Sequence, residues 1–326
     1  MRILFLGGTA FTGPHAVREL VERGHDVTVF HRGEHELDLD LQQVRHVHGD
    51  LSRWDEHVEE LRALRPDVVV DMHAYVADEG RRALDFKGIA QRAVVVSSVD
   101  VYRAFGRALG KEPGPLEPVP LTEDSPLRTV VVDESYDKVA VEGVVQSDPD
   151  FPVTILRYPA VHGPGDPQHR IYGFVRRMDD ARPAILLGET QAVWRWARGY
   201  AEDMGHALAF AVEAGHAGRI YHVSWPVARE LADWVRRIGD VVGWEGRIAV
   251  IPDSALPEAL RFEGVDFRQH YDLDTSRIRD ELGYEEVVGE RTALERTIEW
   301  ERANPPDEFE VDYDAEDAAL ASVGLQ

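Results

Sequence analysis

The feature that most constrains the fold is a glycine-rich turn near the amino terminus. Residues 7–13 follow the apolar run Arg2–Leu6, which is typical of a buried strand, and precede an amphipathic helical pattern that continues to Glu22. Glycines let a backbone approach a bound phosphate, and the first turn of a helix offers free N–H groups and a positive dipole end. The turn therefore predicts a dinucleotide site, and the residues expected to contact the cofactor are Gly7, Gly8, Thr9, Ala10, Phe11, Thr12 and Gly13.

The end of the second expected strand, Asp26–Phe30, decides between the two nicotinamide dinucleotides. An acidic residue there would bind the ribose 2′-hydroxyl and repel a 2′-phosphate. This chain has His31 and Arg32 instead, and a guanidinium can pair with the 2′-phosphate and stack on adenine. NADP(H) is therefore favoured over NAD(H), with an arginine that merely covers the sheet edge as the alternative. Asp50, at the end of the third expected strand, is placed to accept a hydrogen bond from the adenine amino group.

Short apolar runs alternate with helical patterns through the first half of the chain, which is the pattern of βαβ units and a parallel sheet. The expected strands are Arg2–Leu6, Asp26–Phe30, Gln43–His48, Asp67–Asp71, Ala93–Ser97 and Val153–Arg157. A helix is expected at roughly Ser135–Ser147, after a loop rich in proline and glycine. The fold class that follows is α/β, a doubly wound parallel Rossmann sheet with a smaller C-terminal substrate-binding lobe.

The alternation weakens in the second half of the chain. The elements expected there are helices at Tyr172–Asp179, Ala201–Ala214, Arg229–Val242 and Arg291–Ala303 and a strand at Arg219–Val223. Asp307–Asp317 is an acidic tail, expected to be solvated or packed at an edge. Residues 1–165 are expected to form the NAD(P)-binding domain, with residues 200–224 returning to it. Residues 166–199 and 225–326 are expected to form the smaller lobe and the tail.

The composition excludes several kinds of site and partner. The chain has 60 acidic and 36 basic residues and a formal net charge of -24, so its surface is expected to repel nucleic-acid phosphates. It has no cysteine, which excludes disulfides, zinc–thiolate and iron–sulfur sites and a cysteine nucleophile. Its apolar runs are too short for a signal peptide or a membrane span, so a cytoplasmic location is expected. No metal site is expected, because a His-Glu-x-x-His spacing is absent.

Eight short segments occur in one order over nearly the whole chain. They are Gly7–Gly13, Gly49–Asp50, Val94–Tyr102, Lys138–Glu142, Leu156–Asp166, Arg198–Leu208, Arg219–Ser224 and Asp274–Tyr284. Together they resemble the extended short-chain dehydrogenase/reductase superfamily, in its nucleotide-sugar epimerase/dehydratase group. The resemblance implies a Rossmann domain, a C-terminal lobe for a small-molecule substrate, hydride chemistry through NAD(P) and a homodimer.

The resemblance assigns roles to individual residues. Ser98 matches the serine or threonine that hydrogen-bonds the reacting oxygen. Lys138, one of only three lysines in the chain, matches the lysine that holds the nicotinamide ribose and lowers the pKa of a neighbouring tyrosine. Tyr102 supports the site in this family, and His162 stands where a tyrosine is usual. Further cofactor contacts are expected from Leu51, Ser97, Tyr158 and Pro159, and substrate contacts from Tyr102, His162 and Arg195.

The segment before Lys138 departs from the family pattern at the proton-transfer residue. Glu134 stands four residues before the lysine, where the family has tyrosine, and Tyr136 stands two before it. Residues two apart on a regular helix lie about 200° apart around its axis, so Tyr136 faces Lys138 only if that turn is irregular. On that condition Tyr136 is ranked first as the acid/base. Asp100 is second and Glu134 last, because the Lys138 charge would lower the pKa of Glu134.

Two further residues keep more than one interpretation open. Asp100 matches a proton-shuttling acid of the sugar-dehydratase branch, but the acid that precedes it in that branch is Val99 here. A loop carboxylate that caps a nearby N–H is the alternative for Asp100. Arg195 lies between Trp194 and Trp196, where it would pair and stack with a substrate or belong to an ordinary strand with one packed face.

These observations predict an NADP(H)-dependent oxidoreductase or epimerase-like enzyme. Its expected chemistry is hydride transfer at a carbinol or carbonyl carbon of a nucleotide-sugar or another small polar substrate. Because the family's Tyr-x-x-x-Lys element is broken, a non-catalytic NAD(P)-binding sensor or scaffold is the alternative. RNA binding, found in an atypical branch with a related glycine turn, is disfavoured by the net charge of -24.

Overall fold

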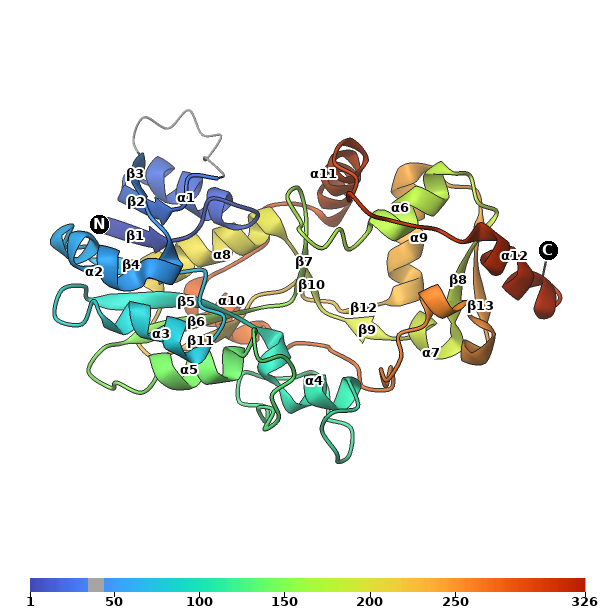
Figure 1. Cartoon of the computed structure of the whole chain (residues 1–326), viewed down its shortest axis with the longest axis horizontal. Coiled ribbons are helices and arrows are strands. Elements are labelled where there is room, and N and C mark those ends of the chain that lie inside the picture. Colours follow the sequence, from blue (N-terminus) through green and yellow to red (C-terminus); the bar gives the residue numbers. More distant parts are fainter. Residues whose placement is uncertain (35–43, 326) are drawn as a thin grey trace.

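The computed structural model describes residues 1–34 and 44–325. Within these residues, seven strands form one parallel sheet in the order β11-β6-β5-β4-β1-β2-β3 (Figure 1). The strands are β1 (Arg2–Leu6), β2 (Asp26–His31), β3 (Val44–His48), β4 (Val68–Asp71), β5 (Arg92–Ser98), β6 (Val153–Tyr158) and β11 (Ile220–His222). This is the strand order of a Rossmann fold with one strand added at the β6 edge, so the predicted doubly wound parallel sheet is confirmed.

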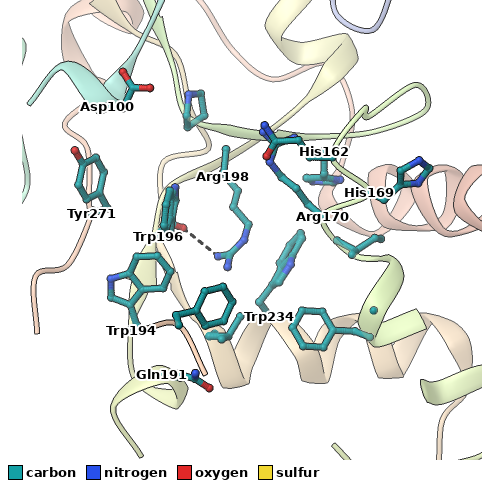
Figure 2. A pocket seen from close by; sticks show the side chains of 18 of the residues that line it. Asp100, His162, His169, Arg170, Gln191, Trp194, Trp196, Arg198, Trp234 and Tyr271 are labelled. Atoms are coloured by element: carbon teal, nitrogen blue, oxygen red, sulfur yellow. Dashed lines mark hydrogen bonds between the residues drawn. The ribbon is translucent and has the colours of Figure 1, made fainter. Parts of the chain in front are cut away.

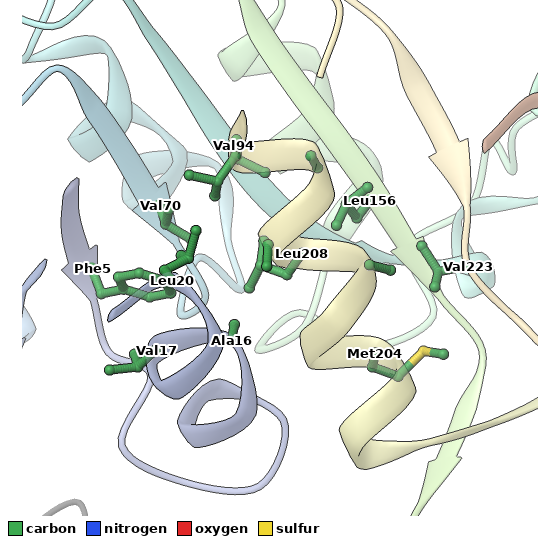
Figure 3. Close-up of a cluster of buried hydrophobic side chains, with 14 of the residues drawn as sticks. Phe5, Ala16, Val17, Leu20, Val70, Val94, Leu156, Met204, Leu208 and Val223 are labelled. Atoms are coloured by element: carbon green, nitrogen blue, oxygen red, sulfur yellow. The ribbon is translucent and has the colours of Figure 1, made fainter. Parts of the chain in front are cut away.

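Helices cover both faces of the sheet, because alternate strand side chains point to opposite sides. These helices are α1 (Gly13–Glu22), α2 (Trp54–Ala63), α3 (Ala77–Leu84), α5 (Lys138–Val145) and α8 (Ala201–Ala214). Helices α1 and α8 pack on the face that carries Phe5 and Val70 (Figure 3). Helices α2, α3 and α5 pack on the face that carries Leu4 and Val69. With both faces closed in this way, a ligand has access to the sheet at the strand ends.

A smaller lobe lies beyond the ends of β5 and β6 (Figure 1). It contains α6 (Tyr172–Asp179), β8 (Ala184–Gly188), α7 (Glu189–Ala192), α9 (Leu231–Val242), β13 (Arg247–Ile251) and α11 (Glu290–Ala303). Its core includes Trp234, Ile238 and Leu294, and β8 pairs with β13 in parallel. Two short strand pairs join the lobe to the sheet, β7 (Ala160–His162) with β10 (Arg198–Tyr200) and β9 (Arg195–Trp196) with β12 (Arg229–Glu230).

The chain ends in a segment that we call the C-terminal arm, residues 304–325. It leaves α11, crosses the lobe and forms α12 (Tyr313–Ser322), drawn in red in Figure 1. Ala319 and Leu320 of this helix are buried in a cluster with residues of β8 and β13. This helix is therefore packed against the lobe, whereas residues 307–310 of the acidic tail that precedes it are exposed, so both predicted states occur.

The remaining elements are α4 (Arg103–Ala108), α10 (Ser276–Leu282) and 3₁₀ turns at Leu51–Arg53, Val99–Val101, Asp253–Ala255 and Glu258–Leu260. Helix α10 and its neighbour Tyr284 pack beside the sheet, in the same cluster as α1 and α8. Among the described residues, no helix combines the length and the apolar character that crossing a membrane requires.

Several predicted elements differ from the structure. The helix expected from Ser135 begins at Lys138, and Arg229–Glu230 forms strand β12 before α9 begins at Leu231. The pair β8 and β13 was not predicted, because its two strands lie far apart in the chain. Gln43, predicted to open the third strand, lies outside the described residues.

Candidate active site

A cavity of about 1730 Å³ lies between the strand ends and the smaller lobe. The sheet side contributes Phe11, the end of β5 and the residues around Lys138. The lobe side contributes residues of β7, β10, α6, α9 and the C-terminal arm (Figure 2). Ligands of open α/β sheets bind at this edge of the sheet, so we take this cavity as the candidate active site.

The glycine-rich turn fits a dinucleotide phosphate group. Gly7 and Gly8 have φ angles of 81° and 95°, which favour glycine. A Cβ on Gly13 would lie 2.4 Å from the carbonyl oxygen of Gly8, so only glycine lets α1 start this close to the turn. Thr12 precedes the helix and makes no side-chain cap, but the Gly13 N–H already donates to the Ala10 carbonyl oxygen at 3.1 Å and Pro14 has no N–H. What the turn offers a pyrophosphate is therefore the close backbone approach that the glycines allow and the positive end of α1.

The end of β2 places the two predicted adenine-side residues in different environments. His31 is 5% exposed, its Nε2 lies 2.9 Å from Nδ1 of His46, and its Nδ1 accepts the Gly33 N–H at 3.2 Å. The His31 ring is therefore held inside the protein. Arg32 is on the surface, where its Nη2 lies 2.9 Å from Oε2 of Glu34 and both side chains are more than half exposed.

The end of β3 brings Asp50 to the same edge. Its Oδ1 accepts the Ser52 N–H at 2.8 Å, and this hydrogen bond, with the Arg32 charge as a smaller cause, lowers the pKa of Asp50. The carboxylate thus caps the turn that begins at Leu51. Of the predicted cofactor contacts near the other end of the dinucleotide, Ser97, Tyr158 and Pro159 line the cavity.

Lys138 is the first residue of α5 and is 3% exposed. Its Nζ donates to the carbonyl oxygens of Ala74 at 2.6 Å and Val96 at 3.1 Å. The ammonium also lies 4.7 Å from the ring centre of Tyr75 and 5.5 Å from that of Tyr136. Burial lowers the pKa of Lys138 to about 8, although the Asp71 and Asp100 carboxylates work against that shift.

Tyr136 lies beside Lys138 because the segment before α5 is a turn. Asp133 Oδ1 accepts both the Ser135 N–H at 2.8 Å and the Ser135 hydroxyl at 2.7 Å, and this local bonding competes with a helix. Tyr136 and Lys138 both line the cavity, whereas Glu134 is exposed and does not. The structure therefore has the irregular turn that the first of the three alternatives required.

The Ser98 side chain contacts Tyr136 and Asp100, the two candidates for proton transfer that line the cavity. Burial raises the pKa of Tyr136, and a hydrogen bond with the Ser98 side chain opposes this rise. Asp100 follows in the 3₁₀ turn after β5, where its N–H donates to Ser98 Oγ at 3.3 Å. Burial raises the pKa of Asp100 to about 6, and its Oδ1 is buried with no partner among the described residues. Ser98, Tyr136, Lys138 and Asp100 thus gather at one end of the cavity.

Tyr102 does not line the cavity. Its side chain is fully buried behind the site, and its hydroxyl accepts a hydrogen bond from Arg157 Nη1 at 2.6 Å and contacts His222. Arg157 also donates to both carboxylate oxygens of Glu142, at 2.9 and 2.6 Å. Ser97 Oγ donates to the same carboxylate at 2.6 Å, so this network ties β5 and β6 to α5.

Two of the predicted substrate contacts are engaged within the protein. His162 is 2% exposed, and its Nδ1 lies 3.0 Å from the Thr297 hydroxyl. Burial lowers the pKa of His162 to about 3, so its ring is neutral. Arg195 is paired with Asp272 at 2.7 Å. Neither side chain offers a charge to a ligand in this arrangement.

Arg198, which was not predicted to contact a ligand, is one of the cations that line the cavity. Its Nη1 donates to the Trp196 carbonyl oxygen at 3.0 Å, and its guanidinium lies 4.8 Å from the ring centre of Trp234 (Figure 2). Among residues 1–34 and 44–325, no carboxylate forms a salt bridge with it. Burial lowers the pKa of Arg198 to about 10, so it stays charged at neutral pH. A half-buried cation without a carboxylate partner is a binding group for an anion.

Comparison with known proteins agrees with this geometry. A dTDP-glucose 4,6-dehydratase of Streptomyces niveus is 26% identical over 346 residues, which cover 93% of this chain and 94% of that protein. The chloroplast stem-loop binding protein of 41 kDa b of Arabidopsis thaliana is 33% identical over 113 residues, only 31% of this chain and 30% of that protein. The enzyme WbmH of Bordetella bronchiseptica, solved with NAD⁺, has the same fold, with a TM-score of 0.71 at 16% identity over 94% of this chain and 99% of that one.

The predicted superfamily and the predicted class of enzyme are confirmed by a match to one family over more than half of the chain, and the homodimer remains a prediction. Residues 3–224, which include the glycine-rich turn, Ser98, Tyr136, Lys138 and Arg198, match one family as a continuous stretch. The chain belongs to the NAD dependent epimerase/dehydratase family.

Proposed function

We propose that this protein is an NADP(H)-dependent oxidoreductase or epimerase that transfers a hydride at a carbinol or carbonyl carbon of a nucleotide-sugar. The observation that carries the proposal is the meeting of Ser98, Tyr136 and Lys138 at one end of a large cavity, despite the altered spacing of the tyrosine. A hydroxyl, a phenol and an ammonium at one point are the groups that a carbonyl reduction requires.

Each of these three residues has a distinct part in the reaction. Bound NADP(H) supplies or accepts the hydride. Ser98 donates a hydrogen bond that orients the substrate oxygen, and Tyr136 gives its proton to that oxygen as the carbonyl becomes an alcohol. The raised pKa of Tyr136 keeps the phenol protonated at neutral pH, as a proton donor requires. The charges of Lys138 and Arg170 then stabilise the tyrosinate until it takes a proton back from water.

Asp100 is the second candidate for the proton transfer. Its raised pKa of about 6 lies near the operating range of a general acid/base. Val99 occupies the position of the preceding acid in the dehydratase branch, so the paired carboxyl groups of that branch are incomplete. This favours epimerisation or reduction over dehydration.

Arg198 supports a substrate with a phosphate group. A half-buried guanidinium that lines a cavity without a carboxylate partner favours a ligand that carries negative charge, and a diphosphate is such a group. In Figure 2 the labelled side chains extend from Asp100, past Arg198, to Gln191, so Arg198 lies part of the way along the cavity. A nucleotide-sugar with its sugar near Ser98 would bring its diphosphate to Arg198. The dehydratase of Streptomyces niveus, by its name, acts on such a compound.

Arg32 supports NADP(H) over NAD(H). An exposed ion pair such as Arg32–Glu34 contributes about 0–1 kcal/mol, whereas a charge-assisted hydrogen bond to a phosphate contributes about 1.5–3 kcal/mol. A 2′-phosphate beside the end of β2 would therefore draw Arg32 away from Glu34.

The proposal is tested by turnover of NADPH with keto forms of nucleotide-sugars, measured at 340 nm on the wild type and on Tyr136→Phe. Removal of one hydroxyl should lower kcat by about 10²–10⁴ and leave the Kd for NADPH unchanged. Glu134→Gln, on the exposed side of the same turn, is the matched control and should keep wild-type kcat. Unchanged turnover in Tyr136→Phe would exclude it as the acid/base and move Asp100→Asn to the test. Tight NADPH binding without turnover on any such sugar would favour the non-catalytic alternative.

A further inference from the structure

A row of aromatic rings leads from the catalytic end of the cavity to its far end. Tyr271, whose hydroxyl donates to the Val99 carbonyl oxygen, stacks on Trp196 with 5.7 Å between ring centres. Trp196 meets Trp194 at 4.2 Å, Trp194 meets Phe267 at 5.2 Å, and Phe267 meets Phe262 at 5.9 Å. All five rings line the cavity, so it continues past Trp196, where the Arg198 guanidinium is bonded, to Phe262.

The C-terminal arm supplies another part of the cavity wall. Five of its residues line the cavity, Phe309, Glu310, Asp312, Ala315 and Glu316. Glu316 Oε1 accepts from Nε and Nη2 of the buried Arg177 at 3.0 and 2.6 Å, and Arg177 also lines the cavity. Since Ala319 and Leu320 are also buried against β8 and β13, the arm is anchored at the last of the residues that line the cavity and in the helical turn that follows.

Two phenylalanines stand out by their exposure. Among the described residues, the aromatic side chains in the exposed class are Phe262, 63% exposed, and Phe309, 42% exposed. Both line this cavity, and each is held by one ring contact, Phe262 by Phe267 and Phe309 by Tyr172 at 5.0 Å. The other Phe, Tyr and Trp rings of the described residues are buried or half-buried, whereas these two are exposed at the same cavity, which is the arrangement of a stacking surface for a flat ligand group.

We infer that the C-terminal arm forms the nucleoside end of the substrate site, where the base of a nucleoside diphosphate stacks on Phe309 and Phe262 while its phosphates bind Arg198. This inference rests on the proposed nucleotide-sugar function and adds the place and the residues of base recognition. Stacking accepts any base, because every base presents a flat face. The arm thus contributes affinity for the nucleoside and takes no part in the hydride transfer.

The inference separates two ligands that share their phosphates. UDP, dTDP or GDP would contact both Arg198 and the two phenylalanines, whereas inorganic pyrophosphate would contact Arg198 alone. Titration calorimetry on the full-length protein measures both. Phe309→Ala should weaken binding of the nucleoside diphosphates about five- to a hundredfold and leave the Kd for pyrophosphate unchanged. Arg198→Met should weaken both ligands.

Controls keep the result interpretable. Glu308→Ala changes an exposed neighbour that does not line the cavity and should leave every Kd unchanged. Phe309→Trp keeps a stacking surface and should restore nucleoside diphosphate binding, which a merely structural role would not predict. If Phe309→Ala and Phe262→Ala both bind nucleoside diphosphates as the wild type does, the inference is overturned. If the wild type binds NADPH but neither nucleoside diphosphates nor pyrophosphate, the proposed substrate class itself fails, and this inference fails with it.

Discussion

Lys138 holds a positive charge in a place from which water is nearly excluded. Burial lowers its pKa from 10.5 to about 8, so between these values the unfolded chain binds a proton that the folded protein does not. Lys138 therefore does not oppose folding above the unfolded pKa of 10.5. Stability is lost as the pH falls from there through about 8, because the folded protein must then take up the buried charge. At neutral pH the protein keeps a destabilising charge, which is expected at a functional position.

Lys138→Met removes this charge and should raise the melting temperature of the cofactor-free protein at pH 7. The gain should shrink between pH 8 and pH 10, because the wild-type lysine is then neutral in the folded state. Turnover should be lost and cofactor binding weakened. Differential scanning calorimetry at several pH values, with the exposed Lys111→Met as control, measures the first effect. A lower melting temperature at pH 7 would mean that the two carbonyl contacts of Lys138 are structural.

The second prediction at the scale of residues concerns Arg32 and the preference for NADP(H). Arg32→Ala should weaken NADP(H) binding about ten- to a hundredfold, through the loss of a charge-assisted phosphate contact, and leave NAD(H) binding nearly unchanged. Glu34→Gln removes the partner that holds Arg32 and should tighten NADP(H) binding slightly. Calorimetry with both cofactors on the three proteins provides the comparison. Equal affinities of the wild type for the two cofactors would contradict the preference.

At the scale of elements, the turn before α5 determines where Tyr136 lies. The Asp133 carboxylate bonds twice to Ser135, and the Asp137 N–H donates to the Tyr75 carbonyl oxygen at 2.7 Å. These bonds hold the segment before Lys138 as a turn, and the helix begins at Lys138. The turn thus brings Tyr136, which stands two residues before the lysine instead of four, to the same cavity as Lys138.

Asp133→Ala should therefore lower kcat about tenfold or more, because a small displacement of Tyr136 misaligns the proton transfer. Asparagine makes the same kind of turn, so Asp133→Asn should restore most of the activity. The Kd for NADPH should be the same in both variants, since neither changes Lys138. Steady-state kinetics and fluorescence titration give the two readouts. Equal losses in both variants would point to the charge of Asp133 and not to the turn.

The junction of the glycine-rich turn with α1 gives another prediction. A Cβ on Gly13 would come within 2.4 Å of the Gly8 backbone, so Gly13→Ala should push the turn from the helix, lower the melting temperature and weaken NADP(H) binding at least tenfold. Gly143 is the matched control, because it is a helical glycine with nothing within 4 Å of an added Cβ. Gly143→Ala should stabilise the protein by about 0.5–1 kcal/mol. A Gly13→Ala protein with normal cofactor affinity would refute the close-approach argument.

The elements that the sequence could predict are those specified by local pattern. The β1 run, the glycine-rich turn and α1 are neighbours in the chain, and Tyr172–Asp179 and Ala201–Ala214 carry clear helical periodicity. Strands β8 and β13 were missed because each is stabilised by a partner some sixty residues away. Arg198 was missed for a related reason, since its lack of a carboxylate partner depends on the tertiary structure. By contrast, Arg195 was predicted to contact the substrate, with an ordinary packed strand as the alternative, and its guanidinium is paired with Asp272.

At the scale of the whole molecule, the chain has a formal net charge of -24, whereas the ligands proposed for its cavity are polyanions. The overall field should repel NADP(H) and nucleoside diphosphates, while Arg32 and Arg198 attract them only at short range. The Debye length falls from about 30 Å at 0.01 M salt to about 8 Å at 0.15 M, so salt screens the overall repulsion more than the contacts.

The association rate constant of NADPH should therefore rise several-fold as the ionic strength increases over this range. NADH, which lacks the 2′-phosphate, should show a smaller rise. Stopped-flow fluorescence at constant temperature gives both rates. An association rate that falls with salt would show that the local arginine field dominates the approach of the ligand.

The chain has three lysines, and only one of them is buried, so amine-specific labelling can detect opening of the interior. Lys87 and Lys111 are exposed, whereas the Lys138 ammonium is enclosed by the carbonyl groups of Ala74 and Val96. An acylating reagent should thus modify two lysine side chains, besides the terminal amine, while the molecule stays folded. A third modification should appear only when the cavity wall around Lys138 opens. The mass spectrum of the labelled chain then gives the fraction of molecules in which Lys138 has been exposed to solvent. The measurement needs no dye and no engineered probe.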